Sequence, residues 1–410
     1  MRSVLSLFLV GWALVGFSGC APALPTADPD HQAAEVATVR VVYEQFMTGE
    51  VLPLQGVPAA TQSASGARRT QTDGTGTVRV PCEAGEHVRV SVSTAGEGPV
   101  RVHTDPAAWL PFNERSGAGA TEVACGETVT LNADRTLANV LVAMREIASF
   151  YEAEFGRTRG PVDVYVNPGR GVGLYSLWNN ISFGEDGLDS PRGLGIMAHE
   201  YAHAFHHRAL GGMPRGRCGM SHSYAGADDF GCAYTEGFAH FAATVALAEL
   251  LPAVYGRPPE SSGHYLRVVL NSGYPGDPSR SDRPDLADDG SVIEGPFAAF
   301  LWDLYDGPNT AGERDESAFD QTNYPLRYIG DVMATCQWVV AGRYRDEDGT
   351  DRLISCFQNR RVPYSETFFR LRYRAGERAW NYRPQEGATE PPDWNPDAIT
   401  ALWRRSLYGL

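Results

Sequence analysis

Six of the ten histidines lie between residues 199 and 240, and the first of them have a spacing that suits metal binding. His199 and His203 are four residues apart, so on a helix they share one face and both imidazoles can reach one metal ion. Glu200 lies one position round the same helix, where its carboxylate can deprotonate a water held by the metal without being a ligand. This stretch therefore predicts a catalytic zinc site.

A catalytic zinc needs a third protein ligand and one open position. One extended signature places a third His six residues after the second, following a Gly at the third residue. Here these places hold Ala209 and His206, which excludes that arrangement. The alternative is a Glu on a following helix, and Glu236 fits it, with His222 as its main rival. His206 and His207 lie one turn beyond His203, and we expect them to be packing or helix-surface residues.

The residues around the third ligand carry a family resemblance. The pair His199–His203 followed by Glu236-Gly-Phe-Ala resembles the gluzincins, bacterial zinc metallopeptidases related in active-site layout to thermolysin. The resemblance covers roughly residues 135–306. It implies that His199, His203 and Glu236 bind one Zn²⁺ and that Glu200 is the general base. Many family members have Asp four residues after the third ligand, where this chain has His240. We expect His240 to support a ligand as an outer-shell partner.

Helices and strands must place these residues. Apolar residues recur every three to four positions in Arg135–Phe155, which predicts an amphipathic helix. A strand at Val162–Val166 and another at Tyr175–Phe183 precede the histidines, and the second resembles the family's substrate-binding edge strand. Further helices are expected in five later segments: Leu194–Leu210, Ala233–Leu251, Phe297–Tyr305, Tyr328–Val340 and Ser365–Tyr373.

The region before residue 132 has a different pattern. Short stretches with a period of two, such as Val39–Tyr43 and His87–Val92, are separated by clusters of Gly, Thr and Ser, which predicts a small β-sandwich. The stretches starting at Thr48 and Thr72 loosely resemble the transthyretin-like domain that accompanies many exported peptidases. We therefore expect a multi-domain chain: signal peptide 1–20, linker 21–37, β-sandwich accessory domain 38–131, and an α+β, zincin-like metallopeptidase domain 132–410 with a mostly helical C-terminal half.

The N-terminus indicates export. Arg2 precedes an apolar stretch from Val4 to Val15 that is too short for a membrane span. The residues that lead to Cys20 resemble a bacterial lipoprotein signal, in which Cys20 becomes the lipidated N-terminus; an ordinary secretory signal cut near Ala21 or Ala23 is the alternative. We expect a cell-envelope protein, either an outer-membrane lipoprotein or a periplasmic or extracellular one. No later segment is expected to span a bilayer.

The cysteines agree with export. Without Cys20, six of the seven remain, and an even number in an exported chain indicates disulfides. They fall into three local pairs, which we predict to be the disulfides Cys82–Cys125, Cys218–Cys232 and Cys336–Cys356.

Composition removes several other functions. All 35 basic residues are arginine, which excludes P-loop, kinase and pyridoxal chemistry, since each needs a lysine. The net charge of −15 and the lack of a basic stripe argue against a nucleic-acid partner.

We therefore expect a zinc-dependent endopeptidase, a monomer, that hydrolyses peptide bonds and is anchored to the membrane through its N-terminal lipid. A peptide substrate would add to the edge strand by main-chain hydrogen bonds. An exopeptidase, or a surface binding or adhesion protein with an inert or structural zinc site, is the alternative. The oxyanion needs a second donor besides the metal, and the sequence offers several: His264, Tyr328, Tyr344 and Tyr364.

Overall fold

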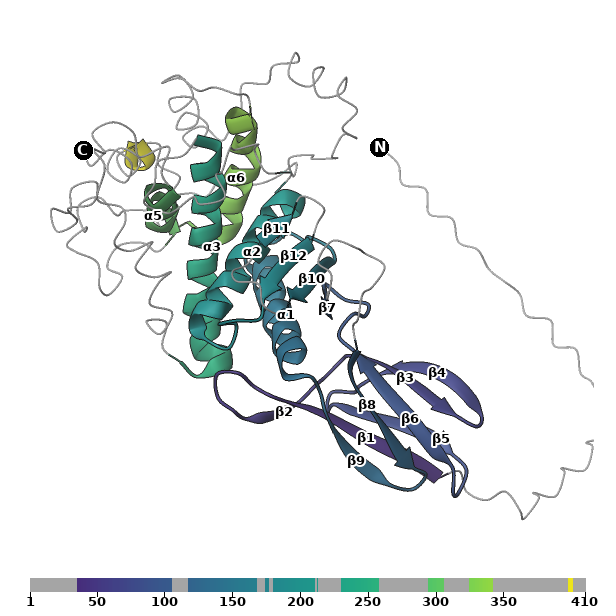
Figure 1. Cartoon of the computed structure of the whole chain (residues 1–410). Helices are drawn as coiled ribbons and strands as arrows, with labels where there is room; N and C mark the ends of the chain where they lie inside the picture. Colours follow the sequence, from purple (N-terminus) through teal and green to yellow (C-terminus); the bar gives the residue numbers. More distant parts are fainter. Residues whose placement is uncertain are drawn as a thin grey trace, which may run out of the picture.

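The computed structural model describes residues 35–104, 117–167, 174–176, 180–210, 212, 230–257, 294–305, 324–341 and 397–400. Strands form the N-terminal part, and the helices gather in the part that follows (Figure 1). The predicted signal peptide 1–20, Cys20 and most of the linker 21–37 lie outside the described residues, as does the predicted helix Ser365–Tyr373. The first strand begins at Glu35, so the last three residues assigned to the linker belong to the sheet.

Two four-stranded sheets make up the N-terminal β region. In β6, Val88, Val90 and Val92 are buried, and the residues between them point outward. This alternation lets each sheet bury one face against the other. One sheet contains β1 (Glu35–Glu44), β2 (Val51–Pro53), β5 (Thr77–Cys82) and β9 (Thr128–Asn132); the other has the order β4 (Gly66–Gln71), β3 (Pro58–Ser63), β6 (His87–Ser93), β8 (Gly117–Ala124).

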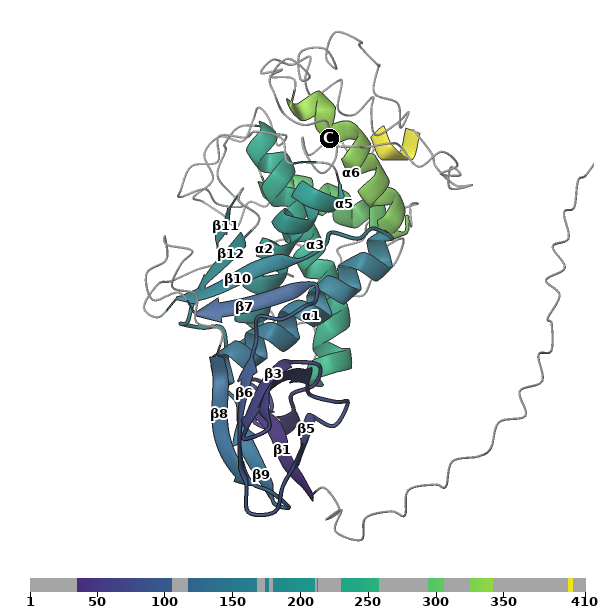
Figure 2. The same ribbon diagram turned by 90° about the vertical axis from the view of Figure 1, so that its right-hand side faces the viewer.

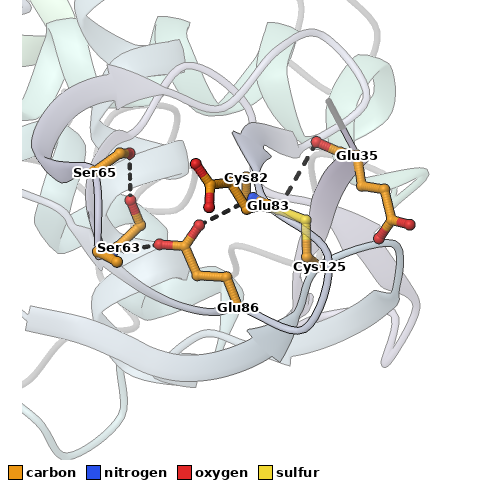
Figure 3. The surroundings of a disulfide bond; sticks show 8 residues. Glu35, Ser63, Ser65, Cys82, Glu83, Glu86 and Cys125 are labelled. Atoms are coloured by element: carbon orange, nitrogen blue, oxygen red, sulfur yellow. Dashed lines mark hydrogen bonds between the residues drawn. A yellow bond between two sulfur atoms is a disulfide. The ribbon is translucent and has the colours of Figure 1, made fainter. Parts of the chain in front are cut away.

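A disulfide joins the two sheets at one end (Figure 3). Cys82 ends β5 and Cys125 directly follows β8, and their Cα atoms are 5.8 Å apart. Beside it, the Glu86 carboxylate accepts hydrogen bonds from the backbone N–H groups of Glu83, at 3.1 Å, and Ala64. These backbone hydrogen bonds lower the pKa of Glu86. The disulfide is the first of the three pairs that the sequence predicts.

Two further cysteines, Cys232 and Cys336, are also disulfide-bonded. The partners predicted for them, Cys218 and Cys356, lie outside the described residues, so both pairings stay predictions.

A third sheet lies beside the helices, and it corrects two expectations (Figure 2). Its strand order is β11 (Leu174–Ser176), β12 (Asn180–Gly184), β10 (Val162–Asn167), β7 (Val100–Thr104). The expected single strand Tyr175–Phe183 is wrong. Ser176 pairs with Asn180 in antiparallel register, so two short strands, β11 and β12, take the place of the expected one.

The second correction concerns the domain boundary at residue 131. Strand β7 belongs by position to the predicted accessory domain, but it pairs with β10 in parallel. The chain thus leaves the sandwich after β6, adds one strand to the third sheet, and returns as β8. A division into 38–131 and 132–410 is therefore too simple.

The longer helices among the described residues are α1 (Arg135–Phe155), α2 (Pro191–Ala209), α3 (Phe230–Tyr255), α5 (Glu294–Tyr305) and α6 (Leu326–Ala341). Helices α1 and α2 contact the third sheet, α3 packs against both of these helices and α6 against α1, and α3, α5 and α6 pack against one another. Helix α1 has the predicted bounds. The Asp134 side chain accepts a hydrogen bond from Leu137 N–H at its start, and Gly156 ends it with a φ of 64°, a left-handed conformation that favours glycine. Its apolar stripe contacts β7 and α2.

Helix α3 is long and apolar enough, by length and composition, to cross a membrane, contrary to the expectation that no later segment is. However, 72% of its apolar window is buried inside the protein, where α3 packs against α2 and α5. A helix that is apolar all round is the pattern of a core helix, and burial explains the hydrophobicity here.

Asn139 of α1 joins the helices to the sandwich. Its side-chain N–H₂ donates to the Glu44 carbonyl at 2.7 Å, and its oxygen accepts from Phe46 N–H at 2.8 Å. Asn139 is buried, so these bonds form away from water. They fix the end of β1 on the first turns of α1.

The disulfide Cys82–Cys125 generates the first testable prediction. The two cysteines are 43 residues apart, and closing a loop of this length reduces the entropy of the unfolded chain enough to contribute about 4 kcal/mol. Replacing both cysteines by serine should lower the free energy of unfolding by up to about that amount. Denaturant titration under non-reducing conditions measures the change. An unchanged midpoint would show that the bond does not tie the sheets.

Candidate metal centre

Helix α2 presents the two histidines, and its start is fixed by local packing. The Ser190 hydroxyl accepts a hydrogen bond from Gly193 N–H at 3.1 Å, and Pro191 occupies the first turn. A Cβ on Gly193 would lie 2.5 Å from the Gly187 carbonyl oxygen and the Leu188 Cα. Only glycine lets the helix start so close to the preceding loop.

Helix α3 presents the carboxylate. Almost every described side chain on this helix is buried, and Glu236 among them is 6% exposed. Burying a carboxylate in apolar surroundings costs several kcal/mol unless it is paired. The partners of Glu236 come from α2.

The side chains of His199, His203 and Glu236 converge on one point. The Nε2 atoms of His199 and His203 are 3.0 Å apart. Oε2 of Glu236 lies 3.2 Å from Nε2 of His199 and 3.0 Å from Nε2 of His203. All three potential ligand atoms lie within 4.8 Å of one another.

These separations fit a metal ion. In a tetrahedral zinc site with bonds of about 2.0–2.1 Å, neighbouring ligand atoms lie about 3.3 Å apart. The observed distances of 3.0 to 3.2 Å are close to that value. Two imidazoles and one carboxylate are also the donor set of a catalytic zinc site with one open position. Among the described residues this is the group that can hold a metal ion.

The protonation states also suit a metal. Burial and, after it, the neighbouring His240 lower the pKa of His199 to about 3, against the opposing effect of Glu236. Burial alone would raise the pKa of Glu236, but the adjacent His203 and His199 hold it well below the usual range. At neutral pH the site therefore offers a neutral imidazole and an ionised carboxylate, the forms that bind a metal.

Glu200 and His240 flank the three ligands. Glu200 follows His199 on α2 and is 8% exposed, as expected for a carboxylate kept within the site. The His240 ring lies against the His199 ring, with 4.6 Å between their centroids. Nε2 of His240 lies 3.4 Å from Oε2 of Glu294, the first residue of α5.

Glu294 and the packing role of Gly237 are not apparent from the sequence alone. An acidic residue at the start of α5, followed by an apolar stretch up to Trp302, was the available signal for Glu294. A Cβ on Gly237 would lie 2.8 Å from the Glu294 carbonyl oxygen and 2.9 Å from Phe297, which explains the glycine directly after Glu236. That contact joins two segments far apart in the sequence, so no local pattern reveals it.

The other histidines and tyrosines have different outcomes. His206 is fully buried against Tyr234 and Phe238, with centroids 5.7 and 4.9 Å away, so it packs as expected. Tyr328 lies in the first turn of α6, beneath the guanidinium of Arg327. The remaining candidates lie outside the described residues: His222, His264, Tyr344 and Tyr364.

One family model matches the part of the chain that holds this site. Residues 180–337 match the mycolysin C-terminal domain. The matched segment runs from β12 through α2, α3 and α5 into α6, and so contains all three potential ligands. It covers less than half of the chain, and it relates the chain to secreted metallopeptidases. None of the curated proteins compared with the chain matches it.

The buried His206 predicts a loss of stability in acid. Burial lowers its pKa to about 3, whereas an unfolded histidine titrates near 6.5. As the pH falls below about 6.5, the unfolded chain gains a proton that the folded chain does not. Stability therefore decreases by about 1.4 kcal/mol per pH unit for this group. Replacing His206 by Leu should remove about 2 kcal/mol of the stability difference between pH 7.5 and 5.

Denaturant titrations of the wild type and of His206→Leu at both pH values measure that difference. The exposed His87 of β6 supplies a matched control in His87→Leu, which should leave the difference unchanged. Equal pH dependence in wild type and His206→Leu would contradict the prediction.

Proposed function

We propose that the chain is an exported zinc metallopeptidase that cleaves peptide bonds with water. The convergence of His199, His203 and Glu236 at one buried point carries this proposal. The match of residues 180–337 to the mycolysin C-terminal domain supports it, because the matched segment contains those residues. We also propose that the domain that carries these residues has a zincin-like fold.

Each residue has a defined task in this reaction. A zinc ion would polarise the scissile carbonyl and lower the pKa of water. Glu200 takes a proton from the attacking water and passes it to the leaving amine, as general acid–base catalysis requires. Glu236 stays ionised beside two imidazoles and so offsets part of the charge of a divalent cation.

The substrate would bind in extended form along β11. Among the described strands, β11 is at the edge of the third sheet, and an edge strand can offer main-chain donors and acceptors to a peptide. Helix α2 contacts both β11 and β12, so a peptide added there would run beside the helix that carries His199 and Glu200. This arrangement favours an endopeptidase, because it binds the middle of an extended chain.

The location and form of the protein are part of the proposal. Lipidation of Cys20 would anchor the chain in the cell envelope, with the residues before β1 as a tether. Predicted disulfides at Cys218–Cys232 and Cys336–Cys356 agree with an oxidising compartment, and the disulfide state of Cys232 and Cys336 supports this. The protein would act as a monomer on peptide or protein substrates.

A surface binding protein with an inert zinc site is the second candidate. It is favoured by His240, which stands where related peptidases carry Asp and places an imidazole against the ligand His199. In that case the β-sandwich would be the functional part.

Replacing Glu200 by Gln separates the two candidates. The amide keeps the shape of the side chain but cannot accept the proton, so peptide cleavage should fall by about 10²–10⁴-fold while zinc binding is retained. Cleavage of a quenched peptide library, with the zinc content measured for each protein, provides the test. Internal cleavage products would favour the endopeptidase over the exopeptidase. A wild-type chain that holds one zinc and cleaves nothing would favour the binding protein.

Replacing Glu236 by Ala tests the third ligand. We expect a large loss of zinc affinity, since one of three protein ligands is removed, measured by competition with a chromophoric chelator. The variant His222→Ala is the matched control and should bind zinc like the wild type. The reverse result would make His222 the third ligand.

A further inference from the structure

A buried carboxylate and an imidazole lie behind the predicted zinc ligands and have no part in the reaction described above. The Glu294 side chain is 1% exposed, and its Oε2 lies 3.4 Å from Nε2 of His240. The His240 ring in turn lies against the His199 ring, with 4.6 Å between their centroids. Glu294, His240 and His199 thus form a continuous series that ends at a ligand.

Packing holds the first member of this series in place. Helix α5 begins at Glu294, and its first turn packs against α3 at Gly237. A side chain at position 237 would have no space there. Gly237 directly follows Glu236. The backbone of Glu294 is therefore fixed against the turn of α3 that carries the third ligand, and His240 lies one helical turn further on the same helix.

The ligand His199 needs such a constraint. The terminal torsion of a histidine is broad and roughly two-fold, so the helix alone does not set the angle of the imidazole plane. The His240 ring lies at 57° to the His199 ring, and the His203 ring lies at 86° to it with its centroid 4.7 Å away. These two rings limit how far His199 can rotate. The His240 ring can limit this rotation only if its own orientation is fixed.

We propose that Glu294 is a positioning residue for the metal centre. Its carboxylate contacts Nε2 of the His240 ring at 3.4 Å and so holds that ring, and the His240 ring fixes the plane of His199 toward the metal. This inference rests on the metal centre of the proposed function, but not on peptide cleavage. Outer-shell partners of this kind commonly change metal affinity by about 10–100-fold.

The test compares Glu294→Gln, His240→Phe and the double variant with the wild-type chain. Zinc affinity is measured by chelator competition, and ligand geometry by the visible absorption of the Co²⁺-loaded protein. Glu294→Gln keeps the size of the side chain, so we expect the fold to remain by circular dichroism. Zinc affinity should fall about 10-fold or more, and the Co²⁺ spectrum should change. In the His240→Phe background, Glu294→Gln should have no further effect on zinc affinity, because the effect passes through His240.

Asp163→Asn is the matched control. Asp163 is a partly buried carboxylate of β10 that also contacts an imidazole, with 3.0 Å between its Oδ1 and Nε2 of His103, and its loss should lower the melting temperature without changing zinc affinity or the Co²⁺ spectrum. Unchanged zinc affinity and Co²⁺ spectrum in Glu294→Gln would overturn the inference, and this variant alone decides the question if His240→Phe does not fold. A full additional loss in the double variant would overturn the route through His240. A wild-type chain that binds zinc but cleaves no peptide would overturn only the proposed function.

Discussion

The structure depends on keeping one ionised carboxylate inside an apolar helix. Glu236 lies within α3, whose described side chains are nearly all buried, and such a charge is tolerated only beside groups that compensate it. The compensating groups are His199 and His203 on α2. The relative position of α2 and α3 is therefore set by the same contacts that would bind a metal, and an error of one residue in the packing of either helix would separate them.

Several contacts prevent such a shift of α2. The Tyr151 hydroxyl donates to the Ala198 carbonyl at 3.1 Å, one residue before the first ligand. At the other end, the Arg157 guanidinium donates to the Ala209 carbonyl at 3.2 Å and pairs with Asp331 of α6. Tyr151 belongs to α1, and Arg157 directly follows Gly156, which ends that helix. The predictable amphipathic helix α1 is thus the scaffold on which the ligand helix is held.

The sequence predicts the features that depend on local pattern. His199 and His203 share a helix face because of their spacing, and the bounds of α1 follow from its periodicity. Glu236 follows from the resemblance of Glu236-Gly-Phe-Ala to the gluzincins. The sequence does not predict features that depend on contacts between distant segments. Strand β7 has the same alternation in either sheet, so its residues do not show that it joins β10. Likewise, the role of Glu294 becomes visible only when α5 packs on Gly237.

The path of β7 bears on whether the sandwich could be a removable pro-domain. Cleavage between β9 and α1 would release β7 with the sandwich and leave β10 as a new sheet edge, which is a site for aggregation. The junction is also poorly suited to proteolysis. Ala133 and Asp134 donate their backbone N–H groups to Val42 and Ala118, and Asp134 caps α1. The sandwich is therefore better described as a permanent support, because it shares both its backbone hydrogen bonds and one of its strands with the part of the chain that carries the metal centre.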